Sequence, residues 1–331
     1  MSLRAALTLL PLAALPTVAF ADAPVVVTDI APIHGLVSRV MAGVGEPHLL
    51  VPPGASPHGY SLRPSDARAL SEAQAVFWIG ESLEPWLEEP IEQLAGQAQV
   101  TEFLAEEGTV TLQFRTSAVF GPSDVEDHDA DHADHEAHDH DDHEEHEEAH
   151  DEHGHEGHNH EGVDPHAWLS PTNGKAWLSV IAENLAQVDP AHAAAYRANA
   201  EAGQAEIESV VTQVSASLPN PAPGFVVFHD AYQYFETSFG LTSLGAISLG
   251  DASDPSVARI AAVRDAVVAA KPACVFSEPQ FNAGLVESVI ADTPVHSLVI
   301  DPLGTDIPLG SDFYAALIAH IGKTFTACFA K

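Results

Sequence analysis

The chain carries few positive charges and no evident membrane-spanning run. Its 331 residues include 12 Lys or Arg against 48 Asp or Glu, which gives a formal net charge of −36. A surface this acidic argues against nucleic acid and anionic lipid as partners, and it favours cations. The apolar stretch Ala5–Val18 is broken by Pro11 and Pro16 and is too short to span a bilayer comfortably.

That stretch instead belongs to a predicted secretion signal. Arg4 supplies a positive start, and Ala19-Phe20-Ala21 matches an A-x-A cleavage pattern. We therefore expect residues 1–21 to be a signal peptide that is cleaved near Ala21, and we expect a periplasmic protein. No cysteine follows the signal directly, which argues against a lipid anchor.

Cysteine is nearly absent, since Cys274 and Cys328 are the only two. In an exported protein a single pair is most simply a disulfide bond. Two buried free thiols are the alternative, while a thiolate metal site is disfavoured by oxidising surroundings.

The remaining sequence predicts an α/β fold with two lobes. A chain of this length with 46% apolar residues is larger than one small core requires. Short apolar strands alternate with helical patterns in both halves, which is typical of parallel-type sheets flanked by helices. An Ala-rich segment after Asp189-Pro190 predicts one long rigid helix that joins the lobes. We expect an N-terminal lobe over 22–188, a linking helix over 189–219 and a C-terminal lobe over 220–331.

One segment, residues 124–161, interrupts the first lobe. It holds 18 of the 48 acids and no Lys or Arg, so half of the net charge lies there. It has no hydrophobic period, and we expect a disordered loop. Histidine tracts of this composition are typical of metal binding, and we expect this one to collect several ions more weakly than a folded site would. Its twelve histidines, the predicted accessory ligands, are His128, His132, His135, His138, His140, His143, His146, His150, His153, His155, His158 and His160.

Three of the eight other histidines occupy positions where an element gives way to a loop. They are His58 in Ser-Pro-His-Gly-Tyr, His166 in Asp-Pro-His-Ala-Trp, and His229 directly after an apolar strand. Ligands of parallel α/β sheets bind at the carboxyl ends of strands. Three imidazoles with one oxygen or water form a usual zinc shell, and such ligands suit zinc better than manganese or calcium.

Four motifs around these histidines resemble a known family. They are Pro53–Asp66 (PGASPHGYSLRPSD), Asp164–Pro171 (DPHAWLSP), Phe228–Tyr232 (FHDAY) and Asp301–Gly304 (DPLG). In this order, with a histidine-rich insertion before the second, they resemble the zinc-binding subunit of high-affinity ABC zinc importers (the ZnuA type). The resemblance covers essentially the whole mature chain. It implies two α/β lobes joined by a rigid helix, with a metal bound in the cleft between them.

The resemblance also implies a ligand set. His58, His166 and His229 correspond to the zinc ligands, and Asp301 corresponds to the acid that completes the site in manganese-selective relatives. Some zinc members carry a Glu before the first ligand, where this chain has Pro57, so the fourth ligand remains either water or Asp301. The resemblance further matches Cys274 and Cys328 to a disulfide pair.

Two acids near these positions have more than one interpretation. Asp230 follows His229 and either caps the next helix, which we favour, or orients a histidine ring. Glu278 ends a strand of the second lobe and either faces the cleft or is a solvated loop acid.

The resemblance implies that the protein delivers zinc to an ABC importer membrane permease. We also expect a monomer, and we expect an auxiliary periplasmic zinc chaperone as a second candidate partner. A manganese-binding homologue is the first alternative function. A secreted zinc hydrolase is a weaker one, because the sequence has no His-Glu-x-x-His and no Gly-x-Ser-x-Gly motif. A metal-binding adhesin is the third.

Overall fold

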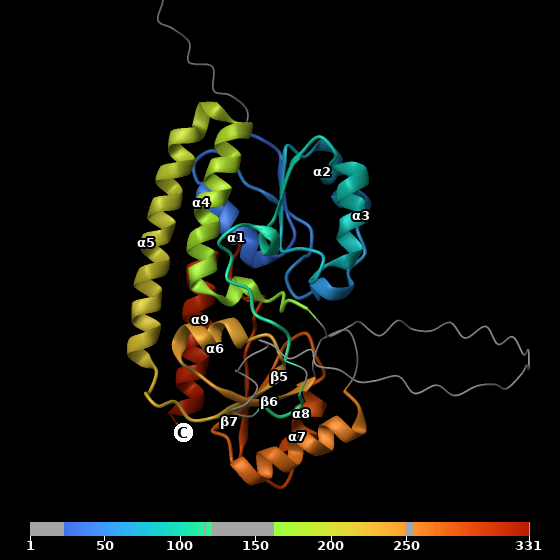
Figure 1. Cartoon of the computed structure of the whole chain (residues 1–331), viewed down its shortest axis with the longest axis vertical. Helices are drawn as coiled ribbons and strands as arrows, with labels where there is room; N and C mark the ends of the chain where they lie inside the picture. The colour runs from blue at the N-terminus through green and yellow to red at the C-terminus, as the bar shows by residue number, and fades with distance from the viewer. Residues whose placement is uncertain (1–22, 116, 121–161, 249–254, 331) are drawn as a thin grey trace, which may run out of the picture.

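The structure is a computed structural model that describes residues 23–115, 117–120, 162–248 and 255–330. Two lobes lie one above the other in Figure 1, each built on a four-stranded parallel sheet, so the predicted α/β fold is confirmed. The predicted signal peptide and the acidic tract lie outside the described residues. None of the helices in the described ranges combines the length and apolar character that crossing a membrane requires.

The first lobe has the strand order β2-β1-β3-β4. Its helix α1 lies on one face of the sheet with α4 and α5. Helices α2 and α3 contact each other and pack on the apolar side chains of the other face. Between β2 and α2 the chain makes a single 3₁₀ turn, η1. The bounds are β1 Val26–Thr28, α1 Ala31–Val40, β2 His48–Leu49, η1 Pro57–Gly59, α2 Pro64–Glu72, β3 Ala75–Trp78, α3 Pro85–Leu94, β4 Gln99–Glu102 and η2 Phe103–Ala105.

The second lobe repeats this plan with the order β6-β5-β7-β8. Helices α7 and α8 contact each other on one side, and α9 returns to the other side, where it packs along α5. The bounds are β5 Phe225–His229, α6 Gln233–Phe239, β6 Ser243–Ser248, α7 Val257–Ala270, β7 Cys274–Ser277, α8 Ala283–Ile290, β8 His296–Val299 and α9 Phe313–Phe329.

Three elements connect the lobes: η3 (Ala167–Leu169), α4 (Pro171–Val188) and, after the turn η4 (Pro190–His192), α5 (Ala193–Ser217). Helix α5 has 25 residues and is therefore about 38 Å long. It contacts α1, α4 and α9 and runs along one side of both lobes (Figure 1), which confirms the predicted linking helix. Gly322 of α9 permits this packing, since a Cβ there would lie 2.7 Å from the Val214 side chain.

The residues on either side of the acidic tract are tied to folded elements. Residues 112–114 pair with 162–164 through Phe114 N to Gly162 O (3.0 Å) and Asp164 N to Leu112 O (2.8 Å). Residues 118–120 then extend the second sheet, because Phe120 N donates to Leu244 O and Ala246 N donates to Ala118 O. Gly245 of β6 is required there, because a Cβ would approach Ala118 O to 2.5 Å. This strap (residues 112–115 and 117–120) joins the first lobe to the edge of the second.

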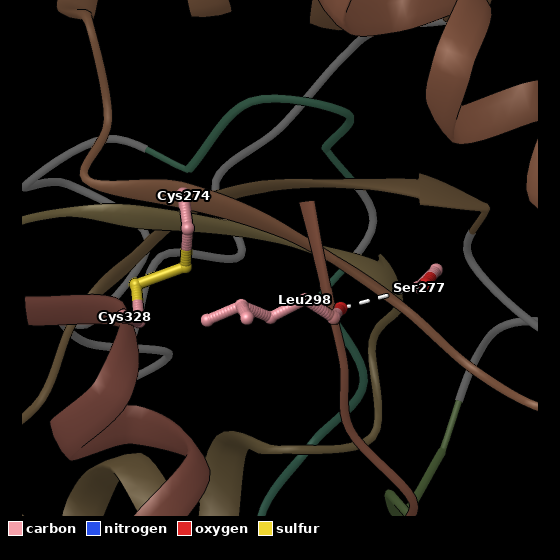
Figure 2. The surroundings of a disulfide bond; sticks show 4 residues. All are labelled: Cys274, Ser277, Leu298 and Cys328. Carbon is pink, nitrogen blue, oxygen red and sulfur yellow. Dashed lines mark hydrogen bonds between the residues drawn. A yellow bond between two sulfur atoms is a disulfide. The ribbon is translucent and has the colours of Figure 1, made fainter. Parts of the chain in front are cut away.

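A disulfide bond joins Cys274 of β7 to Cys328 near the end of α9, as Figure 2 shows. Both residues are fully buried, and the predicted pairing is confirmed. The bond fastens the last helix to a central strand of the second sheet.

Candidate metal centre

The three predicted ligand histidines line one cavity, although 171 residues separate the first from the last. His58 belongs to η1 of the first lobe, His166 precedes η3 between the lobes, and His229 ends β5 of the second lobe. The rest of the lining is mostly apolar: Ser56, Pro57, Trp168, Glu278, Gln280, Phe281, Pro302 and Leu303. Both lobes therefore contribute to one site, and the apolar walls limit the access of water.

His166 and His229 are already arranged for one ion. Their side chains are buried, and their Nε2 atoms lie 3.3 Å apart. Two nitrogens that each bind one zinc ion at about 2.0–2.1 Å with a tetrahedral angle are separated by about 3.3–3.4 Å. The spacing in this chain therefore fits a shared zinc ion.

A carboxylate fixes each of these two rings. Asp164 Oδ1 lies 2.7 Å from His166 Nδ1, and Glu278 Oε1 lies 2.8 Å from His229 Nδ1. Because a carboxylate accepts, each Nδ1 carries the proton, and each Nε2 presents a lone pair to the cavity. Such a carboxylate orients a ligand ring and makes it a stronger base. Glu278 thus faces the cleft, which was one of its two expected positions, while the role of Asp164 was not predicted.

The position of Glu278 follows from the parallel sheet. β5 and β7 are hydrogen-bonded neighbours, and His229 ends the first strand while Glu278 directly follows the second. Since the carboxyl ends of parallel strands meet at one edge, the two side chains converge. Asp164 reaches His166 locally instead, because its Oδ1 also accepts from the backbone N of His166 at 3.0 Å.

His58 lies further out than the other two histidines. Its ring centroid is 5.7 Å from that of His166, against 5.1 Å between His166 and His229, and the residue is partly exposed. Across the described part of the chain, no three or more His, Cys, Asp or Glu side chains already stand at metal-binding spacing. The His58 ring therefore stands further from His166 than the His229 ring does.

The η1 turn is held by its neighbours. Trp86 Nε1 donates to Pro57 O at 2.6 Å, and the Ser56 hydroxyl accepts from His58 N. Beyond the turn, buried Asp66 accepts hydrogen bonds from Arg63 N (3.0 Å) and from the Tyr60 hydroxyl (3.3 Å). The Asp66 carboxylate thereby closes the loop that carries His58.

Helix α2 begins directly after this loop. Arg63 is its cap residue and Pro64 is its first helical residue, where the missing N–H of proline costs nothing. The Asp66 carboxylate accepts the Arg63 backbone N–H and so completes the start of the helix.

Asp66 should make stability depend on pH. Burial raises the pKa of this carboxyl, but hydrogen bonds from Arg63 and His48 outweigh burial and bring the pKa to about 2, below the ordinary 3.8. Because the folded-state pKa is the lower one, the stabilisation is complete above the ordinary value and is lost as the pH falls toward 2. It amounts to about 2 kcal/mol at neutral pH. Asp66→Asn should lower the free energy of unfolding by about that amount at pH 7, and by roughly half of it at pH 3, in urea titrations.

The control for this prediction is Asp265→Asn, which changes an exposed acid of α7. It should alter the free energy of unfolding by less than about 0.5 kcal/mol at either pH. Equal losses for Asp66→Asn at pH 7 and pH 3 would contradict the assignment.

Asp301, the fourth predicted site residue, faces its own loop. Its Oδ1 accepts from Leu303 N (2.9 Å) and its Oδ2 accepts from Thr305 N (2.6 Å). A third donor, Gln280 Nε2, lies 3.1 Å from Oδ1. Asp301 is not among the residues that line the cavity, although its neighbours Pro302 and Leu303 are.

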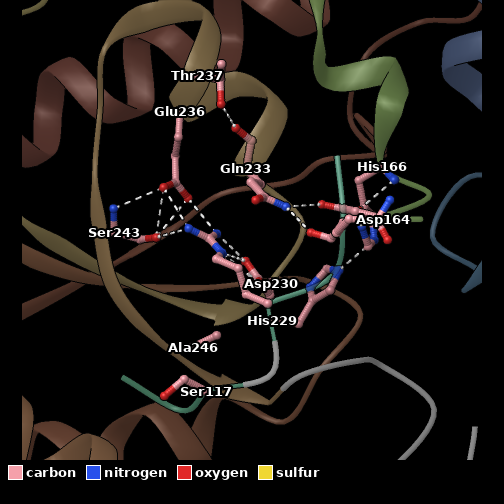
Figure 3. A network of polar contacts seen from close by, with 12 residues as sticks. Ser117, Asp164, His166, His229, Asp230, Gln233, Glu236, Thr237, Ser243 and Ala246 are labelled. Atoms are coloured by element: carbon pink, nitrogen blue, oxygen red, sulfur yellow. Dashed lines mark hydrogen bonds and ion pairs between the residues drawn. The ribbon is translucent and has the colours of Figure 1, made fainter. Parts of the chain in front are cut away.

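Asp230 belongs to a buried charge network behind the histidines. Arg115 of the strap donates from Nε to Asp230 Oδ2 (2.9 Å) and from Nη1 to Glu236 Oε2 (3.1 Å). Figure 3 shows Asp230 beside His229, with Glu236 and Ser243 on the side away from His229. The expected helix cap is wrong, because α6 begins only at Gln233 and the Asp230 carboxylate pairs with Arg115. Burial raises the pKa of Asp230 to about 6, against the effect of Arg115.

The network also reaches the acid that orients His166. Gln233 Nε2 donates to Asp164 Oδ2 at 3.1 Å, and the Tyr234 hydroxyl donates to Asp164 O at 2.7 Å. Arg115 had no signal in the sequence, since an isolated arginine in a loop matches no motif. The twelve tract histidines lie outside the described residues.

Two α/β lobes on a connecting helix, with a histidine cavity at their junction, define a metal-binding protein of the solute-binding class. A family model described as "Zinc-uptake complex component A periplasmic" matches residues 26–328. The chain belongs to this family, ZnuA.

Curated relatives agree with this assignment. The chain is 43% identical over 309 residues to a high-affinity zinc uptake system protein ZnuA of Brucella suis biovar 1 (strain 1330), covering 92% of each chain. It is 43% identical over 318 residues to the protein of that name from Paracoccus denitrificans (strain Pd 1222), covering 96% of this chain and 94% of the relative.

Solved structures share the fold at low sequence identity. A crystal structure of ZnuA superposes with a TM-score of 0.70 at 21% identity and covers 93% of this chain and 100% of its own. A ZnuA deletion mutant with zinc bound gives 0.68 at 24% identity, with 92% and 98% covered. The periplasmic zinc-binding protein TroA of Treponema pallidum gives 0.66 at 19% identity, with 93% and 100% covered.

Proposed function

We propose that the chain binds one zinc ion between His58, His166 and His229, with water as the fourth ligand. The observation that carries the proposal is the pair of carboxylate-bound imidazoles whose Nε2 atoms lie 3.3 Å apart. Zinc at a three-imidazole site keeps one position open. As a member of the ZnuA family, the chain is the periplasmic zinc-binding component of a zinc uptake ABC system.

Zinc is the cargo rather than a catalytic cofactor. The family consists of transport proteins and not of enzymes, and a zinc importer implies a membrane permease as partner. We propose that the mature chain begins near Asp22 after export, works as a monomer and receives part of its zinc from an auxiliary periplasmic chaperone. These points rest on the sequence.

The ligand chemistry favours zinc over manganese. Imidazole nitrogen suits zinc, whereas manganese prefers carboxylate, carbonyl and water oxygens. The carboxylates beside the cavity are used elsewhere: Asp164 and Glu278 bind histidine Nδ1 atoms, and Asp301 accepts backbone N–H groups of its loop.

The histidine tract is the proposed accessory collector. Its C-terminal flank, residues 162–164, pairs with residues 112–114 of the strap directly before His166, whereas residues 118–120 on its N-terminal side pair with β6. The C-terminal end of the tract therefore leads directly to a cavity histidine, which supports a role in gathering zinc close to the tighter site. A chain that must be ordered on binding should hold each ion more weakly than the preformed pair of histidines.

Deletion of residues 127–160 tests both parts of this proposal. In equilibrium dialysis against zinc, the shortened chain should bind one ion, and the full chain should bind the same tight ion plus several weaker ones. A stoichiometry of one for both chains would show that the tract stores no zinc. Absence of any tight ion from the shortened chain would contradict the cavity site.

A further inference from the structure

The side chain of Gln280 lies between the cavity and Asp301. Gln280 follows β7 by three residues and lines the cavity together with the three histidines. Its Nε2 donates to Asp301 Oδ1 at 3.1 Å and lies 3.5 Å from Thr305 Oγ1. An amide nitrogen can donate to a carboxylate, whereas an amide oxygen would be repelled by it, so the orientation of the amide is chemically defined.

This orientation leaves the amide oxygen turned away from Asp301. Gln280 Oε1 is buried and accepts no hydrogen bond from any residue in the described part of the chain. A buried carbonyl oxygen without a donor costs free energy, so a native structure normally supplies one. The donor that the chemistry of the cavity offers is a water molecule bound to the metal, whose protons are made more acidic by the ion.

The same amide also restrains the acid. The Asp301 carboxylate accepts hydrogen bonds from the backbone N–H groups of Leu303 and Thr305. Within the described part of the chain, Gln280 supplies its one side-chain donor. A carboxylate that entered the metal shell would add an anionic oxygen ligand, which favours manganese relative to zinc.

We propose that Gln280 determines the metal preference of the cavity. Its Oε1 accepts a hydrogen bond from the water at the fourth zinc position, and its Nε2 holds Asp301 away from the ion. The inference rests on the proposed zinc site and identifies the residue that completes it. Gln280 is a positioning residue, because it acts through the water and through Asp301.

The test compares zinc and manganese affinities, measured by competition with a chelating dye in the chain without residues 127–160. Gln280→Ala should weaken zinc binding about tenfold, as losses of groups that orient metal ligands typically do, and should raise manganese affinity relative to zinc. Gln280→Met keeps the side-chain volume and should give the same result. Adding Asp301→Asn to Gln280→Ala should abolish the relative gain for manganese.

Gln204→Ala, which removes an amide between α4 and α5, is the matched control and should change neither affinity.

A spectrum of the Co(II)-loaded protein separates metal geometry from general stability. Gln280→Ala should weaken the intense visible bands of four-coordinate cobalt, because Asp301 would join the three histidines and the water as a fifth ligand, and the double variant should restore the bands. An unchanged zinc affinity in both Gln280 variants would overturn the inference, as would a double variant that keeps the raised manganese preference. His166→Ala, measured in parallel, reports on the site itself: if it binds zinc normally, the zinc site is wrong, whatever the Gln280 variants do.

Discussion

Replacing His166 with alanine should weaken zinc binding by roughly two to three orders of magnitude. Zinc sites with four protein ligands bind with about 10–16 kcal/mol, so one ligand in four accounts for about 2.5–4 kcal/mol. His166 is the central member of the trio, because both other rings lie within 6 Å of it. Its loss also leaves the buried Asp164 without its Nδ1 partner.

His58→Ala and His229→Ala should each damage the tight site in the same direction. The measurement is a competition titration in the chain without residues 127–160, so that tract histidines cannot mask the loss. His320→Ala, an exposed histidine of α9, is the control and should bind zinc as the parent does. Any of the three variants that kept the parental affinity would remove its histidine from the ligand set.

Replacing Arg115 with methionine should destabilise the metal-free protein by about 3–5 kcal/mol. The Arg115 side chain is 12% exposed, while the side chains of Asp230 and Glu236 are 2% and 6% exposed. Removing one partner of a buried ion pair leaves uncompensated charge, which costs about that amount. Methionine keeps most of the volume, so the loss reports mainly on the charge. The measurement is urea unfolding followed by circular dichroism at pH 7.

The matched control is Arg197→Met. Arg197 pairs with Glu183 through two hydrogen bonds of 2.7 Å, but both side chains are about half exposed. An exposed pair of this kind contributes about 0–1 kcal/mol. If both arginine variants lost equally little stability, the Arg115 network would be no more than a surface ion pair.

The elements that the sequence predicted well are those with a local signal. Apolar runs such as Phe225–His229 and the Ala-rich stretch of α5 have periods that sequence alone displays, although α5 begins at Ala193 and not at Asp189-Pro190, because a 3₁₀ turn comes first. The three histidines could be singled out because each lies where an element meets a loop, and motif resemblance then grouped them.

The partners of those histidines could not be predicted in the same way. Glu278 reaches His229 only because β7 lies beside β5 in the sheet. The residues of a strand do not reveal which other strand will be its neighbour. Arg115 meets Asp230 across more than a hundred residues, through a strap that has no strand pattern of its own. Asp230 was assigned to a helix cap because position favoured it, and a long-range ion pair overrode that local preference.

The pairing of residues 118–120 with β6 also bears on self-association. An open sheet edge presents unpaired N–H and C=O groups, to which a second copy of the chain can add its own strand. Here the chain itself occupies that edge beside Gly245, and the 18 acids of residues 124–161 follow at once in the sequence. A second copy of the chain therefore cannot pair its backbone with β6 at Gly245 unless it first displaces residues 118–120.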